Sequence, residues 1–134
     1  MPLPKPVVSN SGPLITLATI GRLALLEALF KEIAVPQAVH DEVVVHGSGE
    51  PGSAEISAAP WIRVYQVQDK LAVNLLQESL GAGESEAIVL AQELHAGLVL
   101  IDDALARRKA SHIELRLTGT LGILLIAKDA GLTF

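Results

Sequence analysis

The stretch GESEAIVLAQELHAGLVLIDD, residues 83–103, carries two structural signals in succession. Between residues 84 and 95, Ala87, Leu90, Ala91 and Leu94 recur at intervals of three and four, which predicts an amphipathic helix. Residues 97–101 then form a continuous apolar run of strand length, typical of a strand covered on both faces. A helix followed directly by such a strand predicts a parallel α/β sheet.

The rest of the chain repeats this alternation of strands and helices. Apolar or β-branched runs predict strands at 7–9, 32–36 and 115–118, while 61–67 predicts an edge strand or an extended connector. Helical spacing predicts helices at 14–20, 23–30, 37–45, 70–80, 104–114 and 120–130. The last helix is apolar nearly all round, so we expect it to be buried. Residues 46–52 are rich in Gly, Ser and Pro and predict a loop.

The length of the chain and the alternation of strands and helices predict one α/β domain over residues 1–134, with helices on both faces of its sheet. Hydrophobic residues make up 50% of the chain, which excludes intrinsic disorder. The chain has no cysteine, which excludes disulfides, zinc–thiolate sites and a cysteine nucleophile, and fits a cytoplasmic location. Residues 1–6 contain three prolines, and polar residues interrupt 14–30, so we expect neither a signal peptide nor a membrane span.

Acidic and amide side chains fall where a parallel sheet binds its ligands, outside the carboxyl ends of the strands. Carboxylates converging there would repel one another unless a cation such as Mg²⁺ or Mn²⁺ neutralised them, and such an ion could promote phosphate hydrolysis. The same residue types also cap helices or form turns, and spacing alone leaves both interpretations open. The candidates are Asn10, Glu42, Glu84, Glu86, Asp102 and Asp103.

Basic residues cluster just after these acids. Arg107, Arg108, Lys109 and Arg116 are four of the 10 Lys and Arg residues. Such a run is usually a solvated face, but beside an acidic metal cleft it would suit a phosphodiester substrate. The chain has a net charge of −5, and assigning the five candidate acids to a cation site leaves ten acids against ten bases. The acidic balance is therefore compatible with a nucleic-acid substrate.

Distinctive motifs occur in five segments, at 7–17, 33–43, 81–91, 98–103 and 118–124. Together they resemble the PIN-domain family, the nuclease fold that includes VapC-like toxins. They are most similar to a compact bacterial and archaeal branch of that family. The most specific match is GAGESEAIVLA at 81–91, whose family acid falls on Glu86, with Glu84 as an extra acid of the branch. The others are VVSNSGPLITL at 7–17, IAVP at 33–36 with VHDEV at 39–43, LVLIDD at 98–103 and TGTLGIL at 118–124.

The resemblance implies a three-layer α/β/α sandwich around a parallel sheet of about five strands. It also implies hydrolysis of RNA by a Mg²⁺- or Mn²⁺-dependent ribonuclease, often the toxin of a toxin–antitoxin pair, and usually a homodimer. On this reading Glu42, Glu84, Glu86 and Asp102 or Asp103 hold the ion and Asn10 assists catalysis. The phosphates of the RNA would be held by Arg107, Arg108 and Arg116.

The sequence departs from the family at its first catalytic position. PIN nucleases normally carry Asp there, whereas this chain has Asn10, which can still offer an oxygen to a cation but carries no charge. The alternative interpretation is therefore a non-catalytic PIN-like module that binds RNA or a protein. A second alternative is local: alignment on the strand end selects Asp102 as the ligand, and alignment on the Thr-x-Asp pattern selects Asp103.

Overall fold

The computed structural model describes residues 5–132, and a five-stranded parallel sheet lies at its centre. The strand order is β3-β2-β1-β4-β5, so β1 lies in the middle of the sheet and β3 and β5 form its edges. The parallel sheet predicted from the alternating pattern is thus confirmed. The strands are β1 (Val7–Ser9), β2 (Ile33–Pro36), β3 (Ile62–Tyr65), β4 (Leu98–Leu100) and β5 (Leu117–Thr118).

Helices connect the strands, as parallel pairing requires. A π-helical turn, η1 (Asp41–Val45), continues α3 without a break and ends at the loop that follows. Such turns inside helices are frequent at functional sites. The α-helices of the described residues are α1 (Ser11–Thr19), α2 (Ala24–Phe30), α3 (Gln37–His40), α4 (Ser53–Ala58), α5 (Lys70–Leu76), α6 (Ala82–Glu93), α7 (Ala104–Ser111) and α8 (Thr120–Asp129).

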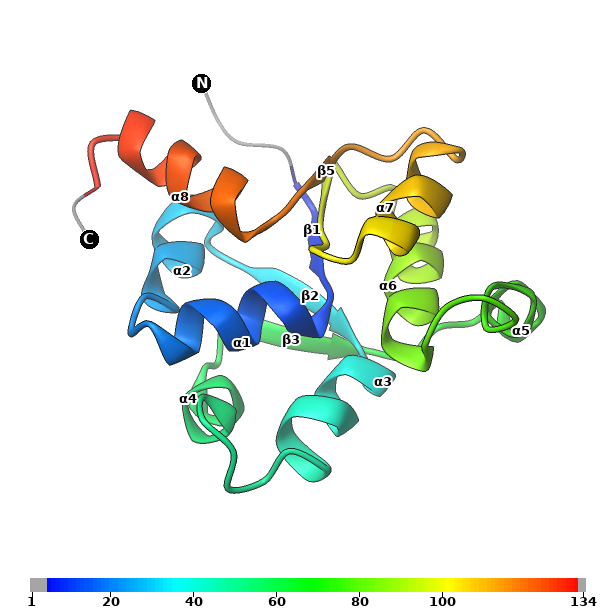
Figure 1. Cartoon of the computed structure of the whole chain (residues 1–134), viewed down its shortest axis with the longest axis horizontal. Helices are drawn as coiled ribbons and strands as arrows, with labels where there is room; N and C mark the ends of the chain where they lie inside the picture. Colours follow the sequence, from blue (N-terminus) through cyan, green and yellow to red (C-terminus); the bar gives the residue numbers. More distant parts are fainter. Residues whose placement is uncertain (1–4, 133–134) are drawn as a thin grey trace.

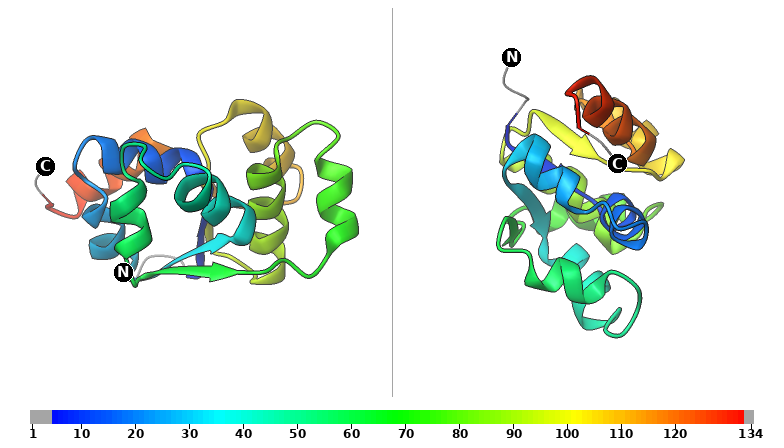
Figure 2. Two further views of the ribbon diagram at one scale, coloured as in Figure 1. Left: turned by 90° about the horizontal axis from the view of Figure 1, so that it is seen from below. Right: turned by 90° about the vertical axis from the view of Figure 1, so that its left-hand side faces the viewer.

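Two buried clusters cover the two faces of the sheet. Because side chains alternate along a strand, Val7 joins one cluster with α1, α2 and α8, and its neighbour Val8 joins the other with α5, α6 and α7. Figure 1 shows these two groups of helices on either side of β1, and Figure 2 shows the layers from two further directions. This arrangement is the expected α/β/α sandwich.

The carboxyl ends of β1 and β4 lie side by side at the point where the strand order reverses. From β1 the chain adds β2 and β3 on one side of the sheet, and β4 and β5 on the other. The N–H of Asn10 donates to the carbonyl of Leu100 at 2.9 Å, which extends the pairing of the two strands to their ends. In open α/β sheets a reversal of this kind leaves a crevice in which ligands bind.

Two expectations about helices were wrong or incomplete. The helix at 120–130 was expected to be buried all round, but Leu121 and Leu125 of α8 are 72% and 54% exposed. Only Ile123 and Ala127 of α8 are buried, because the helix packs on its neighbours with one side. α4 was not predicted, because it is only six residues long and directly follows a Gly- and Pro-rich segment. None of the helices within 5–132 is long and apolar enough to cross a membrane.

Candidate metal centre

Asn10 and Glu42 come together at the carboxyl end of β1. Asn10 occupies the N-cap position of α1 but makes no capping bond, and its buried Oδ1 has no hydrogen-bond partner among residues 5–132. Leaving such an acceptor unpaired costs about 1–3 kcal/mol, so binding of a group that supplies the missing partner of Oδ1 is favoured. A simple helix-capping role for Asn10 is therefore not what the structure shows.

Gly83 of α6 keeps the space between these two side chains open. A Cβ built at Gly83 would stand 3.0 Å from Oε2 of Glu42 and 3.3 Å from Oδ1 of Asn10. The glycine thus borders a small opening that has an amide oxygen and a carboxylate oxygen on its rim. Figure 1 shows the starts of α1, α3 and α6 gathered at this end of the sheet.

Ser11 orients Glu42. Its hydroxyl lies 3.2 Å from Oε1 and 3.3 Å from Oε2 of the carboxylate, so it donates to one or the other. Ser11 is buried at the start of α1, while Glu42 is exposed on η1. The pair ties the π-helical turn to the end of β1. Sequence reasoning did not single out Ser11, although a hydroxyl residue directly after a predicted ligand is a signal that could have identified it.

Asp102 is held by the first residue of α8. The backbone N–H of Thr120 donates to Oδ1 and its hydroxyl donates to Oδ2, both at 2.6 Å. Gly119 makes this approach possible, because a Cβ there would stand 2.5 Å from Oδ1. The other carboxylate oxygen lies 3.5 Å from the Cβ position of Gly12, so Asp102 faces the first turn of α1. Thr120 was not among the predicted site residues.

Three of the other candidate acids bind backbone N–H groups at helix starts. Asp103 caps α7 by accepting from the N–H of Ala106 at 2.8 Å, and Glu84 accepts from Gly81 at 3.2 Å at the start of α6. Glu86 reaches across to α3 and accepts from Ala38 at 3.0 Å. These bonds favour the capping interpretation for Asp103 and Glu84, and they give Glu86 a part in joining α6 to α3.

The predicted acids therefore do not converge as closely as the sequence suggested. Within residues 5–132, no three His, Asp or Glu side chains are grouped so that they could hold a metal ion. The physical reason is that helix starts and Thr120 engage most of the carboxylates, and the first position is a neutral amide. An open hollow of about 610 Å³ lies between η1 and the start of α6, and Glu42, Gly83 and Glu84 line it.

The basic residues are divided between the two ends of the sheet. Arg107 and Arg108 lie on α7, and Nη1 of Arg107 is 3.2 Å from the Cβ position of Gly119, beside Asp102. Arg116 precedes β5 and is therefore at the amino side of that strand. The one contact within 4.0 Å between a basic and an acidic side chain in the described range is His40 with Asp41 at 3.6 Å, so these arginines have no carboxylate partner.

A family model for the PIN domain matches residues 6–133 of the sequence. The chain belongs to the PIN-domain family. PIN domains are generally nucleases, and those nucleases generally use divalent metal ions. No curated protein matches the sequence significantly.

The residues of this PIN domain fit a divalent cation at one position. The unpaired Oδ1 of Asn10 and the carboxylate of Glu42 border the opening at Gly83. Amide and carboxylate oxygens are ligands that Mg²⁺ and Mn²⁺ accept, with water completing the shell. Ser11 adds a hydroxyl bound to the same carboxylate. The donor set thus fits a hard cation, although it carries less negative charge than a group of several carboxylates would.

Proposed function

We propose that this PIN domain is a Mg²⁺- or Mn²⁺-dependent ribonuclease that hydrolyses RNA phosphodiester bonds. The observation that carries the proposal is the buried, unpaired Oδ1 of Asn10 beside the carboxylate of Glu42, at the reversal point of the sheet. Family membership supports the choice of nuclease over other metal-dependent activities. RNA as the substrate class rests on the resemblance to VapC-like toxins.

In this proposal each side chain has a distinct part. Asn10 and Glu42 bind the ion directly, and Ser11 fixes the Glu42 carboxylate by its hydrogen bond. Asp102 and Glu86 add negative charge around the ion, and Arg107 contacts the phosphate beside Asp102. When bound, the ion supplies an activated water and stabilises the charge that develops on the phosphate.

The test compares RNA cleavage by the wild type, Glu42→Gln and Glu86→Gln in the presence of Mn²⁺. Each substitution removes a charge but keeps an oxygen, so the bond from Ala38 to residue 86 can persist. We expect both variants to lose cleavage, and Glu42→Gln to lose the thermal shift with Mn²⁺. Glu55→Gln, an exposed acid on α4, is the matched control. Cleavage by both variants at the wild-type rate contradicts the proposal.

A second function, a non-catalytic module that binds RNA or a protein, has its own supporting observation. The neutral Asn10 stands at the first catalytic position, and residues 5–132 contain no group of three metal-binding acids. This alternative predicts no thermal shift with Mn²⁺ and unchanged RNA binding in Glu42→Gln. The Mn²⁺ titration therefore separates the two functions without depending on the choice of RNA substrate.

We also propose that the protein acts in the cytoplasm as the toxin of a toxin–antitoxin pair and forms a homodimer. The support is the resemblance to VapC-like toxins. Co-expression with the product of the neighbouring reading frame tests the pairing. We expect that product to co-purify with the chain and to relieve growth inhibition, whereas equal growth with and without it contradicts a toxin role.

A further inference from the structure

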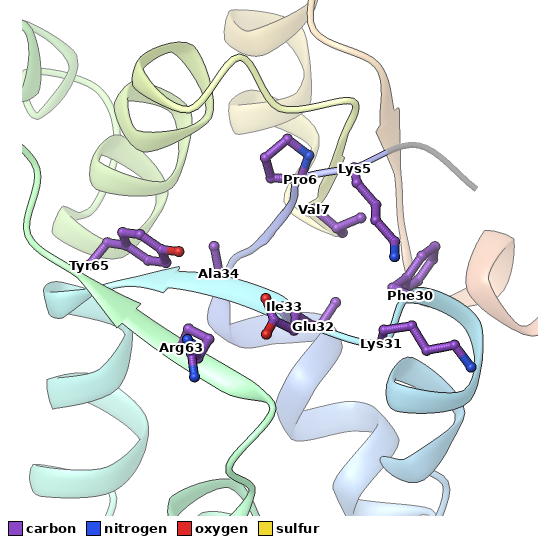
Figure 3. A pocket seen from close by; sticks show the side chains of 10 residues that line it. All are labelled: Lys5, Pro6, Val7, Phe30, Lys31, Glu32, Ile33, Ala34, Arg63 and Tyr65. Carbon is purple, nitrogen blue, oxygen red and sulfur yellow. The ribbon is translucent and has the colours of Figure 1, made fainter. Parts of the chain in front are cut away.

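A second hollow, of about 410 Å³, begins at the amino ends of β1 and β2 and reaches Tyr65, the last residue of β3. Val7 and Ile33, the first residues of β1 and β2, line it, whereas Asn10 follows β1 at the opposite end. No residue that lines this hollow also lines the one beside Glu42 and Gly83, so the two sites are distinct. Figure 3 shows it from close by.

The hollow exists because β3 is an edge strand whose face is not fully covered by helices. α6 packs on β1, β2 and β4. Arg63 and Tyr65 are two residues apart on β3, so their side chains lie on the same face of the sheet, and both are exposed. Their neighbour on that face is Ala34, which pairs with Arg63 and is too small to fill the space. In Figure 3 the ring of Tyr65 lies over this part of the sheet, near Ala34.

Three cations surround the hollow, and each comes from a different segment. Lys5 precedes β1, Lys31 directly follows α2, and Arg63 belongs to β3. Glu32 is the one acid in the lining, so the local charge is positive although the chain carries −5 overall. Within the described range no Lys or Arg lies within 4.0 Å of a carboxylate, so these cations are free to bind an external anion.

We propose that this hollow binds a nucleotide, with its phosphate on Lys5, Lys31 and Arg63 and its base stacked on Tyr65. Lys and Arg bind phosphate through charge-assisted hydrogen bonds, and an exposed aromatic ring next to them offers a stacking surface for a base. The volume of the hollow lies within the usual range for small-ligand sites. A free nucleotide and a nucleotide within an RNA strand share this chemistry. The proposal does not depend on nuclease activity.

The test measures binding of AMP by calorimetry, and of a fluorescein-labelled ten-nucleotide oligo(A) by anisotropy, with EDTA present throughout. We expect the double variant Lys31→Ala/Arg63→Ala to bind AMP at least about tenfold more weakly, because two phosphate contacts are lost. Tyr65→Leu weakens AMP by about tenfold through lost stacking, but leaves binding of inorganic phosphate unchanged. All three side chains are exposed, so the fold tolerates their replacement.

The matched control is Lys70→Ala/Lys128→Ala, which removes two exposed cations outside the hollow and should bind AMP as the wild type does. Tighter binding of oligo(A) than of AMP identifies an RNA strand as the source, and the reverse identifies a free nucleotide. The proposal is overturned if the hollow variants and the control bind AMP equally, or if a poly-glutamate peptide binds as well as AMP. Loss of Mn²⁺-dependent cleavage in Glu42→Gln bears on the proposed function alone.

Discussion

Asn10 brings a neutral amide into a buried position beside a carboxylate. An Asn10→Asp variant would place a second negative charge near Glu42, and without a metal ion we expect it to lower the free energy of unfolding by about 1–3 kcal/mol. Saturating Mn²⁺ should restore stability, because binding to the folded state alone stabilises it. Thermal unfolding in EDTA and in Mn²⁺ measures both effects. The exposed Asn74→Asp is the control, and identical behaviour of the two variants contradicts a cation site at Asn10.

In the proposed ribonuclease, Thr120 acts on the site through Asp102. Removal of its hydroxyl in Thr120→Val leaves Oδ2 of Asp102 without its donor, so the carboxylate can turn away from α1. Loss of such an orienting group typically costs about tenfold to a hundredfold in activity, and we expect RNA cleavage to fall by that factor. Thr120→Ser keeps the hydroxyl and should cleave RNA at nearly the wild-type rate. Wild-type cleavage by Thr120→Val would contradict an orienting role for the hydroxyl.

At the scale of elements, two adjacent aspartates contact different helices: Asp103 contacts the start of α7 and Asp102 contacts the start of α8. Asp103 caps α7, so Asp103→Ala should lower the free energy of unfolding by about 1 kcal/mol, whereas Asp103→Asn keeps the cap. We expect Asp103→Asn to cleave RNA normally and Asp102→Asn to lose cleavage. Denaturant unfolding and a cleavage assay on the same preparations measure the two effects. Loss of cleavage in Asp103→Asn with normal stability would assign the ligand role to Asp103.

α6 offers a test of the opening itself. In Gly83→Ala the new methyl group would stand 3.0 Å from Oε2 of Glu42 and displace it from the rim of the opening. Alanine favours a helix over glycine by about 1 kcal/mol, so stability should fall little or not at all while Mn²⁺ affinity falls. Calorimetric titration with Mn²⁺ measures this. Gly12→Ala, where the Cβ meets Asp102 at an ordinary 3.5 Å, is the control, and unchanged affinity in Gly83→Ala argues against the site.

The elements with strong periodicity were predictable, and the site was predictable only in part. Residues 97–101 and 84–95 match β4 and α6 closely, because a continuous apolar run and a three-to-four spacing each favour one structure. The helix predicted at 37–45 covers α3 and η1, but its spacing does not reveal the π-helical turn, and α4 carries no such pattern. The sequence placed Asn10 and Glu42 at one edge of the sheet, but it could not separate ligands from helix caps. Glu84 and Asp103 are the residue types that serve both purposes, and only the positions of their backbone donors decide between them.

At the scale of the whole molecule, the direction of the strands decides which cations can serve the candidate metal centre. Arg107 lies beside Asp102 at the carboxyl ends, whereas Arg116 enters β5 from its amino side. The two arginines are close in sequence, and the topology places them at different levels of the sheet. The sequence-based prediction grouped Arg107, Arg108 and Arg116 in one basic cluster. Their spacing in the sequence could not show that the fold places them at two different ends of the sheet.

This geometry predicts unequal effects on RNA cleavage. Arg107→Ala removes a cation next to the position where the proposed mechanism places the reacting phosphate, so the KM for RNA should rise by about tenfold. Arg116→Ala removes the same charge at the other level of the sheet and should change KM by less than about twofold, since salt at physiological strength screens charges beyond about 8 Å. Initial rates at several RNA concentrations give both values, and a steeper salt dependence for wild type than for Arg107→Ala confirms the lost phosphate contact. Equal KM increases in the two variants would mean that the RNA follows the edge of the sheet along β5 rather than entering only at its carboxyl ends.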